Sequence, residues 1–263
     1  MIASFFQNLN AFGVDHLLIS GQATVLYGAA TFSEDIDLWL DPIPENCARF
    51  LEVLRAVQAR YYKLTPALTV EHLQRGHGFH FVLPEGGGDE VYLDVMGVPP
   101  RVGNFTGANA SAQWKETDWG RLRVIGIRDL VELKKTQRLE DYPIIGRLAL
   151  AYLAQPECPR KPPDFHWAIQ NVFTLPELHE LFAEWPQATG ALPPDASREL
   201  AAFASQWNES HEVGEPVEQA LSRLMQAEIA KLQDADRRYW RTIVSELKSL
   251  RASKALVPEN ALV

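Results

Sequence analysis

The chain is poor in the features that secreted, disulfide-bonded and membrane-spanning proteins need. It has two cysteines in 263 residues, Cys47 and Cys158, far apart in the sequence. We therefore expect reduced thiols rather than a disulfide or a cysteine-ligated zinc site. No apolar run approaches the ~18–20 residues of a membrane span. The first residues lack the basic region and the long apolar stretch of a signal peptide. These absences predict a cytoplasmic protein with no membrane partner.

Positive charge is also scarce, with 25 Lys and Arg against 34 Asp and Glu and a net charge of −9. This balance disfavours broad, sequence-blind binding to nucleic acid, which depends on neutralising phosphates with basic side chains. One segment is an exception: residues 231–254 contain seven basic positions and three acidic ones. Two interpretations of it stay open, a solvated helix face and a contact with the phosphates of an RNA or a nucleotide.

What the chain does have is acidic residues set in apolar, strand-like segments. Asp35 and Asp37 flank Ile36, and Asp94 stands in a second apolar segment, residues 91–96. Because side chains on a strand alternate between faces, Asp35 and Asp37 project to the same side about 6–7 Å apart. Crowded carboxylates repel each other, and Mg²⁺, which prefers hard oxygen ligands, relieves that cost. The pattern predicts a divalent-metal site.

The alternative for these acids is structural: Asp35 ends a strand, Asp37 pairs with an arginine and Asp94 is incidental. That arrangement is disfavoured, because a buried carboxylate without a partner costs several kcal/mol.

A tight turn precedes the acids. Residues 16–19 form a short apolar segment, Ser20 and Gly21 follow, and helical spacing then runs from Gln22 to Gly28, a glycine that we interpret as the helix stop. A strand-to-helix turn of small residues lets the backbone approach an anion and directs the helix N-terminus at it. We predict that Ser20, Gly21 and Gln22 offer donors to a phosphate group. Ser33, beside the acid pair, either contacts phosphate or belongs to a turn.

Over about residues 15–140 this pattern resembles the DNA polymerase β-like nucleotidyltransferase superfamily. The shared features are a small-residue pair, a gap, an acid–apolar–acid triplet and a third acid on a later strand. Twelve residues separate Gln22 from Asp35, or thirteen if the pair is Ser20–Gly21. The family carries a small residue at the position of Gln22. This departure leaves open how tightly the chain would hold a triphosphate. Minimal nucleotidyltransferases and AbiEii-like toxin-type enzymes are the members most similar in length and in the helical half after the acids.

The resemblance implies a fold and an activity. The fold is α+β, a nucleotidyltransferase-type mixed sheet flanked by helices and followed by a mainly helical C-terminal domain. The activity is Mg²⁺-dependent transfer of a nucleoside monophosphate from an NTP, such as ATP, to an acceptor hydroxyl. Asp35 and Asp37 would hold two Mg²⁺ ions, and Asp94 would complete the shell of the second and accept the hydroxyl proton.

The acceptor is not fixed by the fold. The toxin-type resemblance implies RNA or protein as acceptor and a cognate antitoxin as partner. A small-molecule, antibiotic-type nucleotidyltransferase is an alternative, as is a non-catalytic domain that binds a nucleotide or a partner.

The resemblance also extends to a helix that we predict over residues 128–139. Relatives carry a lysine-rich helix there that is followed by an arginine. Lys134 or Lys135, together with Arg138, would then reach the triphosphate, although solvent-facing helix charges explain them equally well. Lys134 is the preferred lysine because it would share a helix face with Leu130 and Arg138.

The remaining segments set the organisation. Residues 77–83 and 90–96 read as strands, and the glycine-rich residues 84–89 read as the hairpin loop between them, which makes the two strands antiparallel. His77 and His80 lie three apart on the first of these strands, so they point to opposite faces and are a poor metal pair. His16 reads as a surface residue or as one whose hydrogen bonds are satisfied.

A proline-dense break at residues 155–163 places the domain boundary, giving a catalytic domain at 1–155 and a helical domain at 156–263. Helices are expected at about 164–185, 196–208 and 215–252. The last has an apolar side, with Trp240, Ile243 and Val244 among its members, that we interpret as a core face packing on the first domain.

Overall fold

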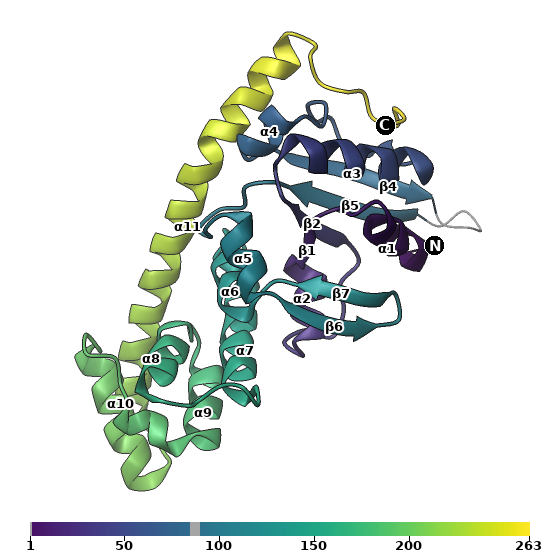
Figure 1. Ribbon diagram of the computed structural model, residues 1–263. Helices are drawn as coiled ribbons and strands as arrows, with labels where there is room; N and C mark the ends of the chain where they lie inside the picture. Colours follow the sequence, from purple (N-terminus) through teal and green to yellow (C-terminus); the bar gives the residue numbers. More distant parts are fainter. Residues whose placement is uncertain (1, 85–89) are drawn as a thin grey trace. The chain divides into compact units, whose positions relative to one another are not determined.

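The computed structural model describes residues 2–84 and 90–263, and it confirms the α+β class (Figure 1). The chain divides into two compact units. One consists of Met1–Leu26, Ala30–Leu133 and Arg238–Val263, and the other of Tyr27–Ala29 and Lys134–Arg237. This division differs from the predicted boundary after residue 155, because the helix that starts at Asp141 packs with the later helices and the end of the chain returns to the first unit.

The first unit is built on one seven-stranded mixed sheet with the order β3-β4-β5-β2-β1-β7-β6. β2 pairs with β5, and β1 with β7, in parallel, whereas the other neighbours are antiparallel. The predicted antiparallel pairing of β4 with β5 is confirmed, although most of its predicted loop, at 85–89, lies outside the described residues. The strands are β1 His16–Ile19, β2 Ile36–Leu40, β3 Arg60–Tyr61, β4 Gly78–Pro84, β5 Glu90–Met96, β6 Gln113–Thr117 and β7 Gly120–Val124.

Helices surround this sheet. α3 shows why they form: Pro44 occupies its first turn, where a missing N–H costs nothing. Phe50, Val53 and Leu54 then recur at helical spacing and are fully buried. The helices of this unit are α1 Ile2–Ala11, α2 Ser20–Leu26, α3 Pro44–Ala56, α4 Val70–Gln74, α5 Phe105–Ser111, α6 Ile127–Lys134 and the last part of α11, which spans Glu215–Ala252.

The predicted helix over 128–139 is wrong at its end, because α6 stops at Lys134. Asp141, at the start of the next helix, provides the reason. Its carboxylate accepts a hydrogen bond from Thr136 Oγ1 at 2.6 Å and from Lys134 Nζ at 3.0 Å. These bonds favour a turn over further helix. Lys134 and Arg138 therefore do not share a helix face.

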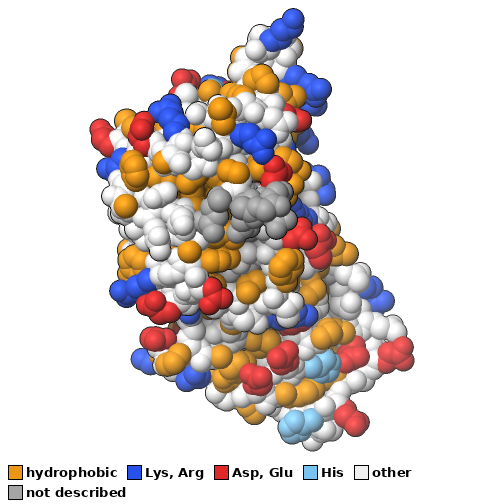
Figure 2. All heavy atoms as spheres, turned by 90° about the vertical axis from the view of Figure 1, so that its right-hand side faces the viewer, with side chains coloured by type: hydrophobic (Ala, Val, Ile, Leu, Met, Phe, Trp, Pro, Cys, Tyr) orange, Lys and Arg blue, Asp and Glu red, His pale blue; other side chains and the backbone are white. Residues whose placement is uncertain are grey.

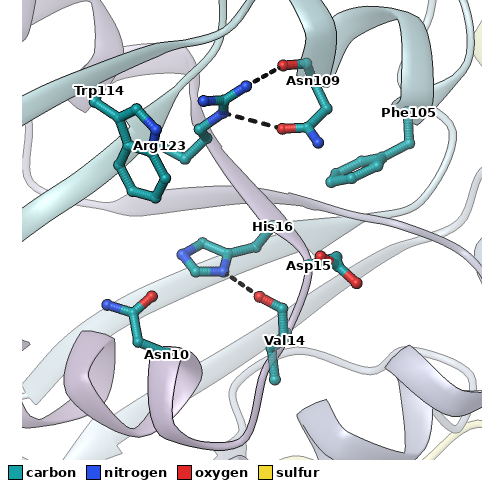
Figure 3. A pocket seen from close by; sticks show the side chains of 8 residues that line it. All are labelled: Asn10, Val14, Asp15, His16, Phe105, Asn109, Trp114 and Arg123. Atoms are coloured by element: carbon teal, nitrogen blue, oxygen red, sulfur yellow. Dashed lines mark hydrogen bonds between the residues drawn. The ribbon is translucent and has the colours of Figure 1, made fainter.

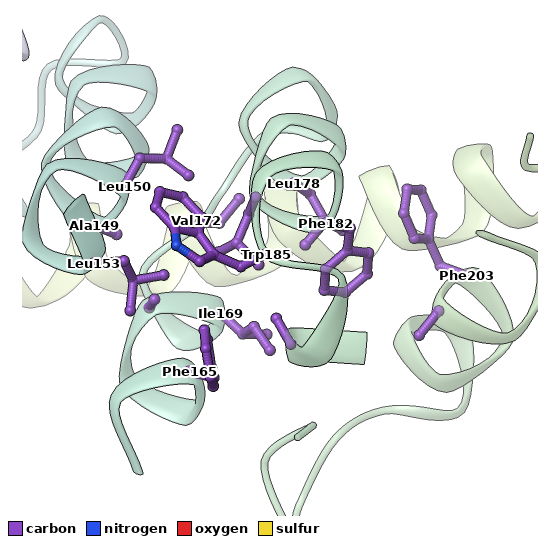
Figure 4. Packing of buried hydrophobic residues seen from close by; sticks show 14 of the residues in the cluster. Ala149, Leu150, Leu153, Phe165, Ile169, Val172, Leu178, Phe182, Trp185 and Phe203 are labelled. Atoms are coloured by element: carbon purple, nitrogen blue, oxygen red, sulfur yellow. The ribbon is translucent and has the colours of Figure 1, made fainter. Parts of the chain in front are cut away.

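The second unit is helical, as predicted, and has a hydrophobic core of its own (Figure 4). Leu153, Phe165, Phe182 and Phe203 are buried in it. The predicted helix at 164–185 is two helices, since Pro176 lies in the first turn of the second one and cannot continue a preceding helix. The helices are α7 Asp141–Ala154, α8 Pro162–Gln170, α9 Leu175–Glu184, a 3₁₀ turn at Pro186–Gly190, α10 Arg198–Ser210 and the first part of α11.

Acidic and basic side chains are interspersed on the face drawn in Figure 2, and no large patch of one sign covers the described part of it. Across residues 2–84 and 90–263, every helix is either too short or too polar to cross a lipid bilayer.

Candidate functional site

A row of paired side chains crosses the middle of the sheet. His80 on β4 pairs with Asp94 on β5, Asp94 pairs with Asp37 on β2, and Asp37 pairs with Ile19 on β1. Directly paired residues of neighbouring strands point to the same face of a sheet. The structure thus brings the predicted Asp37 and Asp94 together on one face.

Asp35 immediately precedes β2 and is exposed, whereas Asp37 and Asp94 are half-buried. Because Asp35 lies outside β2, its projection to the same side as Asp37 stays a prediction. The carboxylates at positions 37 and 94 are the pair that adjacent strands hold side by side.

A pocket of about 300 Å³ opens over this row. Its floor holds the two aspartates and His80, and its wall is the apolar side of α11. The apolar side of α11 was predicted to be a core face. In the structure it lines the pocket, and 43% of the surface of Val244 stays exposed. The lining residues are Ile19, Asp37, Gly78, His80, Asp94, Val95, Met96, Trp240, Ile243, Val244 and Leu247.

His80 is the functional candidate that the sequence analysis missed. Its Nδ1 lies 2.6 Å from Asp94 Oδ1. Because an ionised carboxylate only accepts hydrogen bonds, Nδ1 carries the proton, and the Nε2 of a neutral ring is left as an acceptor. A signal was present in the sequence: once Pro84 pairs with Glu90 across a hairpin, position 80 falls opposite position 94.

The predicted small-residue turn packs against the loop before the acids. α2 begins at Ser20, two residues earlier than expected, and Ser20 has a left-handed backbone with φ 56°. A Cβ on Gly21 would lie 2.2 Å from Ser33 Oγ, so any other residue there would require Ser33 to move. Gln22 Nε2 donates to the Ser33 carbonyl oxygen at 2.7 Å. Ser20, Gly21, Gln22 and Ser33 therefore form one local cluster, in which the Gln22 amide already has a protein partner. Gly28, with φ 76°, follows the end of α2 as expected for a helix stop.

Lys134 and Arg138 belong to the second unit. Lys134 pairs with Asp141, and both side chains are largely buried, with 12% and 6% of their surfaces exposed. Arg138 is exposed. The contact of these two residues with a triphosphate stays a prediction.

Within the described ranges 2–84 and 90–263, no three His, Cys, Asp or Glu side chains are grouped as metal ligands. Two carboxylates on paired strands still suit Mg²⁺, which is commonly held by one or two protein carboxylates and completes its shell with water and substrate phosphates. The donors at positions 37 and 94 fit an ion that binds together with a nucleotide.

A second pocket, of about 190 Å³, lies between α1, α5 and the β6–β7 hairpin (Figure 3). Its polar groups mostly satisfy one another. His16 Nδ1 lies 2.8 Å from the Val14 carbonyl oxygen, and burial lowers the pKa of this imidazole. Arg123 donates to the side chain and the backbone of Asn109 and stacks on Trp114. His16 is accordingly buried with one ring nitrogen satisfied, and this pocket reads as structural.

No family model and no curated protein matches the chain. Among solved structures, it is similar to an antigenic nucleotidyltransferase-like protein from Paracoccidioides brasiliensis. The two are 16% identical, the match covers 72% of this chain and 89% of that one, and the TM-score is 0.42. At this level the similarity assigns no residue a role.

Proposed function

We propose that the protein transfers a nucleoside monophosphate from an NTP to an acceptor hydroxyl. The observation that carries this proposal is the pairing of Asp37 with Asp94 on neighbouring strands, at the floor of a pocket. Mg²⁺ prefers hard oxygen ligands and is commonly held by one or two protein carboxylates. Adjacent strands place two such carboxylates side by side here.

Each part of the site has a role in this reaction. Asp37 and Asp94 would hold Mg²⁺ through their carboxylate oxygens, with Asp35 as the further acid that the sequence pattern supplies. When bound, the ion neutralises charge on the phosphates and on the leaving pyrophosphate. The turn at Ser20 and Gly21 would place backbone N–H groups against the triphosphate.

The experiment is transfer of label from α-labelled NTPs in a Mg²⁺ buffer, with whole-cell lysate as the source of acceptors. Asp37→Asn and Asp94→Asn should each lower transfer by about 10²-fold or more. Asp195→Asn serves as the matched control, because Asp195 is an exposed aspartate of the second unit. Transfer that persists in an Asp37→Asn/Asp94→Asn double variant of unchanged stability would remove this mechanism.

A non-catalytic domain that binds a nucleotide or a partner is the second candidate. Two contacts favour it: His80 engages Asp94, and Ser33 engages the Gln22 amide. The two functions differ in one measurable way. Such a domain would be stabilised by an NTP or a protein partner, yet would never release pyrophosphate from the NTP.

A further inference from the structure

We propose that the pocket over the Asp37–Asp94 pair binds the acceptor, and that the acceptor is a small, uncharged molecule with a hydroxyl group on an apolar body. The chemical step rests on the proposed function, whereas the binding does not.

The lining of the pocket selects against the charged acceptors. Among the described residues it includes no lysine or arginine, and seven of its eleven residues are apolar. An RNA acceptor brings phosphates that need cationic partners. A polycationic antibiotic would find two carboxylates, one of them already bonded to His80, facing a wall of Trp240, Val244 and Leu247. An uncharged molecule with a hydroxyl group suits both the apolar wall and the polar floor of the pocket. Its apolar body would pack on α11, and its hydroxyl would contact the polar floor.

The size of the pocket agrees with a small molecule. About 300 Å³ lies at the lower end of the ~300–1,000 Å³ found for ligand sites. Such a volume encloses a compact ligand rather than a segment of a folded polymer.

His80 is placed to receive the hydroxyl. Its Nδ1 faces Asp94, which leaves Nε2 on the side of Gly78. Gly78 lies two residues before His80 on β4, hence on the same face, and it has no side chain to cover the ring. A Cβ on Gly78 would lie 3.8 Å from Nε2. The absent side chain leaves open the space beside the acceptor nitrogen.

The step balances without a further reactant. The acceptor oxygen forms a bond to the α-phosphorus of the NTP while the bond from that phosphorus to the bridging oxygen of pyrophosphate breaks. The acceptor hydroxyl loses its proton to water. The product is a nucleotidylated acceptor plus pyrophosphate.

The binding test uses the whole chain and 2-naphthol, an uncharged hydroxylated aromatic, titrated by calorimetry without nucleotide. Saturable binding is expected. Gly78→Val, which fills the space beside Nε2 at an ordinary contact distance, should weaken it at least tenfold, as should Val244→Glu in the apolar wall. Leu139→Glu is the control, because Leu139 is an exposed apolar residue of the second unit. Absence of saturable binding, or equal affinity in both pocket variants and the wild type, would overturn the proposal.

Two further measurements separate this inference from the proposed function. Suppose that adenosine binds, that Gly78→Val and Val244→Glu weaken its binding, and that 2-naphthol does not bind. The pocket then belongs to the nucleotide, and the inference fails. If 2-naphthol binds but no NTP with Mg²⁺ is bound or cleaved, the proposed function fails and the pocket stands as a binding site.

Discussion

Gly21 is the residue of the candidate site with the least freedom to change. Its missing side chain makes room for Ser33, whose Cβ would lie 3.0 Å from a Cβ at position 21 and whose Oγ would lie 2.2 Å away. We expect Gly21→Ala to push the loop before Asp35 outward, to lower the free energy of unfolding by about 1–3 kcal/mol and to weaken NTP-dependent thermal stabilisation. Urea denaturation and thermal shifts measure the two effects.

The compensating variant tests the cause of that loss. Ser33→Gly removes the side-chain atoms that a methyl group at position 21 would meet, so Gly21→Ala/Ser33→Gly should recover much of the stability that Gly21→Ala loses. If the double variant is as unstable as the sum of the two single ones, the contact with Ser33 is not what requires glycine.

His77 makes stability depend on pH. Its side chain is fully buried, and desolvation lowers the pKa of the imidazole below its ordinary value of 6.5. Glu246 opposes this shift, because its Oε2 lies 3.2 Å from Nε2 of His77. The nearby His72 and Arg75 lower the pKa further. The unfolded chain therefore binds the proton more readily. The contribution of His77 is fully present above pH 6.5 and is lost as the pH falls toward the lowered folded-state pKa.

Chemical denaturation at a series of pH values checks this dependence. We expect the free energy of unfolding to decline below pH 6.5 in the wild type and to decline less steeply in His77→Leu. A remainder should persist in the variant, because burial also lowers the pKa of His16. Identical slopes in the two proteins would contradict the role given to His77.

The residues of the site were predictable to the extent that local patterns define them. The sequence pointed to Asp37 and Asp94 because a carboxylate in an apolar strand is costly. The structure pairs them on neighbouring strands, and their role in a site stays a prediction. His80 was missed because its role depends on strand register, which a distance of three from His77 does not reveal. The protein partner of the Gln22 amide, Ser33, depends on a loop conformation that the sequence pattern leaves open.

Elements with strong apolar runs were predicted closely, and weakly apolar ones were not. β1 and β5 begin and end where the sequence indicated. β6 was missed because its residues are polar or exposed, and β3 because it has two residues. The end of α6 was misjudged because tertiary bonds to Asp141 overrode a continuous helical pattern.

The last residues of the chain stabilise the edge of the sheet. Tyr61 donates its N–H to Ala261 and accepts from the Asn260 N–H through its carbonyl, at 2.9 and 2.7 Å, and Thr65 accepts from Val257 at 2.8 Å. Without residues 255–263, the backbone groups of Tyr61 and Thr65 would form hydrogen bonds with water instead. The loss of these bonds is partly offset, because the chain no longer pays the conformational entropy of ordering residues 255–263. We expect a net loss of about 1–3 kcal/mol in the free energy of unfolding.

Truncation after Lys254 and urea denaturation test that role. Hydrogen exchange at Tyr61 should rise with the truncation, while exchange at Leu18 in the central β1 should stay slow. A truncated chain with unchanged stability and unchanged exchange at Tyr61 would show that the segment contributes little.

At the scale of the whole molecule, charge decides which polymers the protein can bind. The net charge is −9, and two of the seven basic positions in residues 231–254 are paired along α11, Lys231 with Glu228 and Arg237 with Asp234. The exposed remainder is Arg238, Arg241, Lys248, Arg251 and Lys254. So few cations on a strongly acidic protein give a weak attraction for a polyanion.

We therefore expect no tight, sequence-blind binding of RNA. In filter binding with a tRNA-length RNA, affinity at about 150 mM salt should be no better than the ~10⁻⁴–10⁻⁶ M of non-specific contacts. Arg238→Glu/Arg241→Glu should change it little. Nanomolar affinity that falls steeply between about 50 and 200 mM salt and disappears in the double variant would instead identify this segment as an RNA-binding face, and it would favour a polymer over a small molecule as the acceptor.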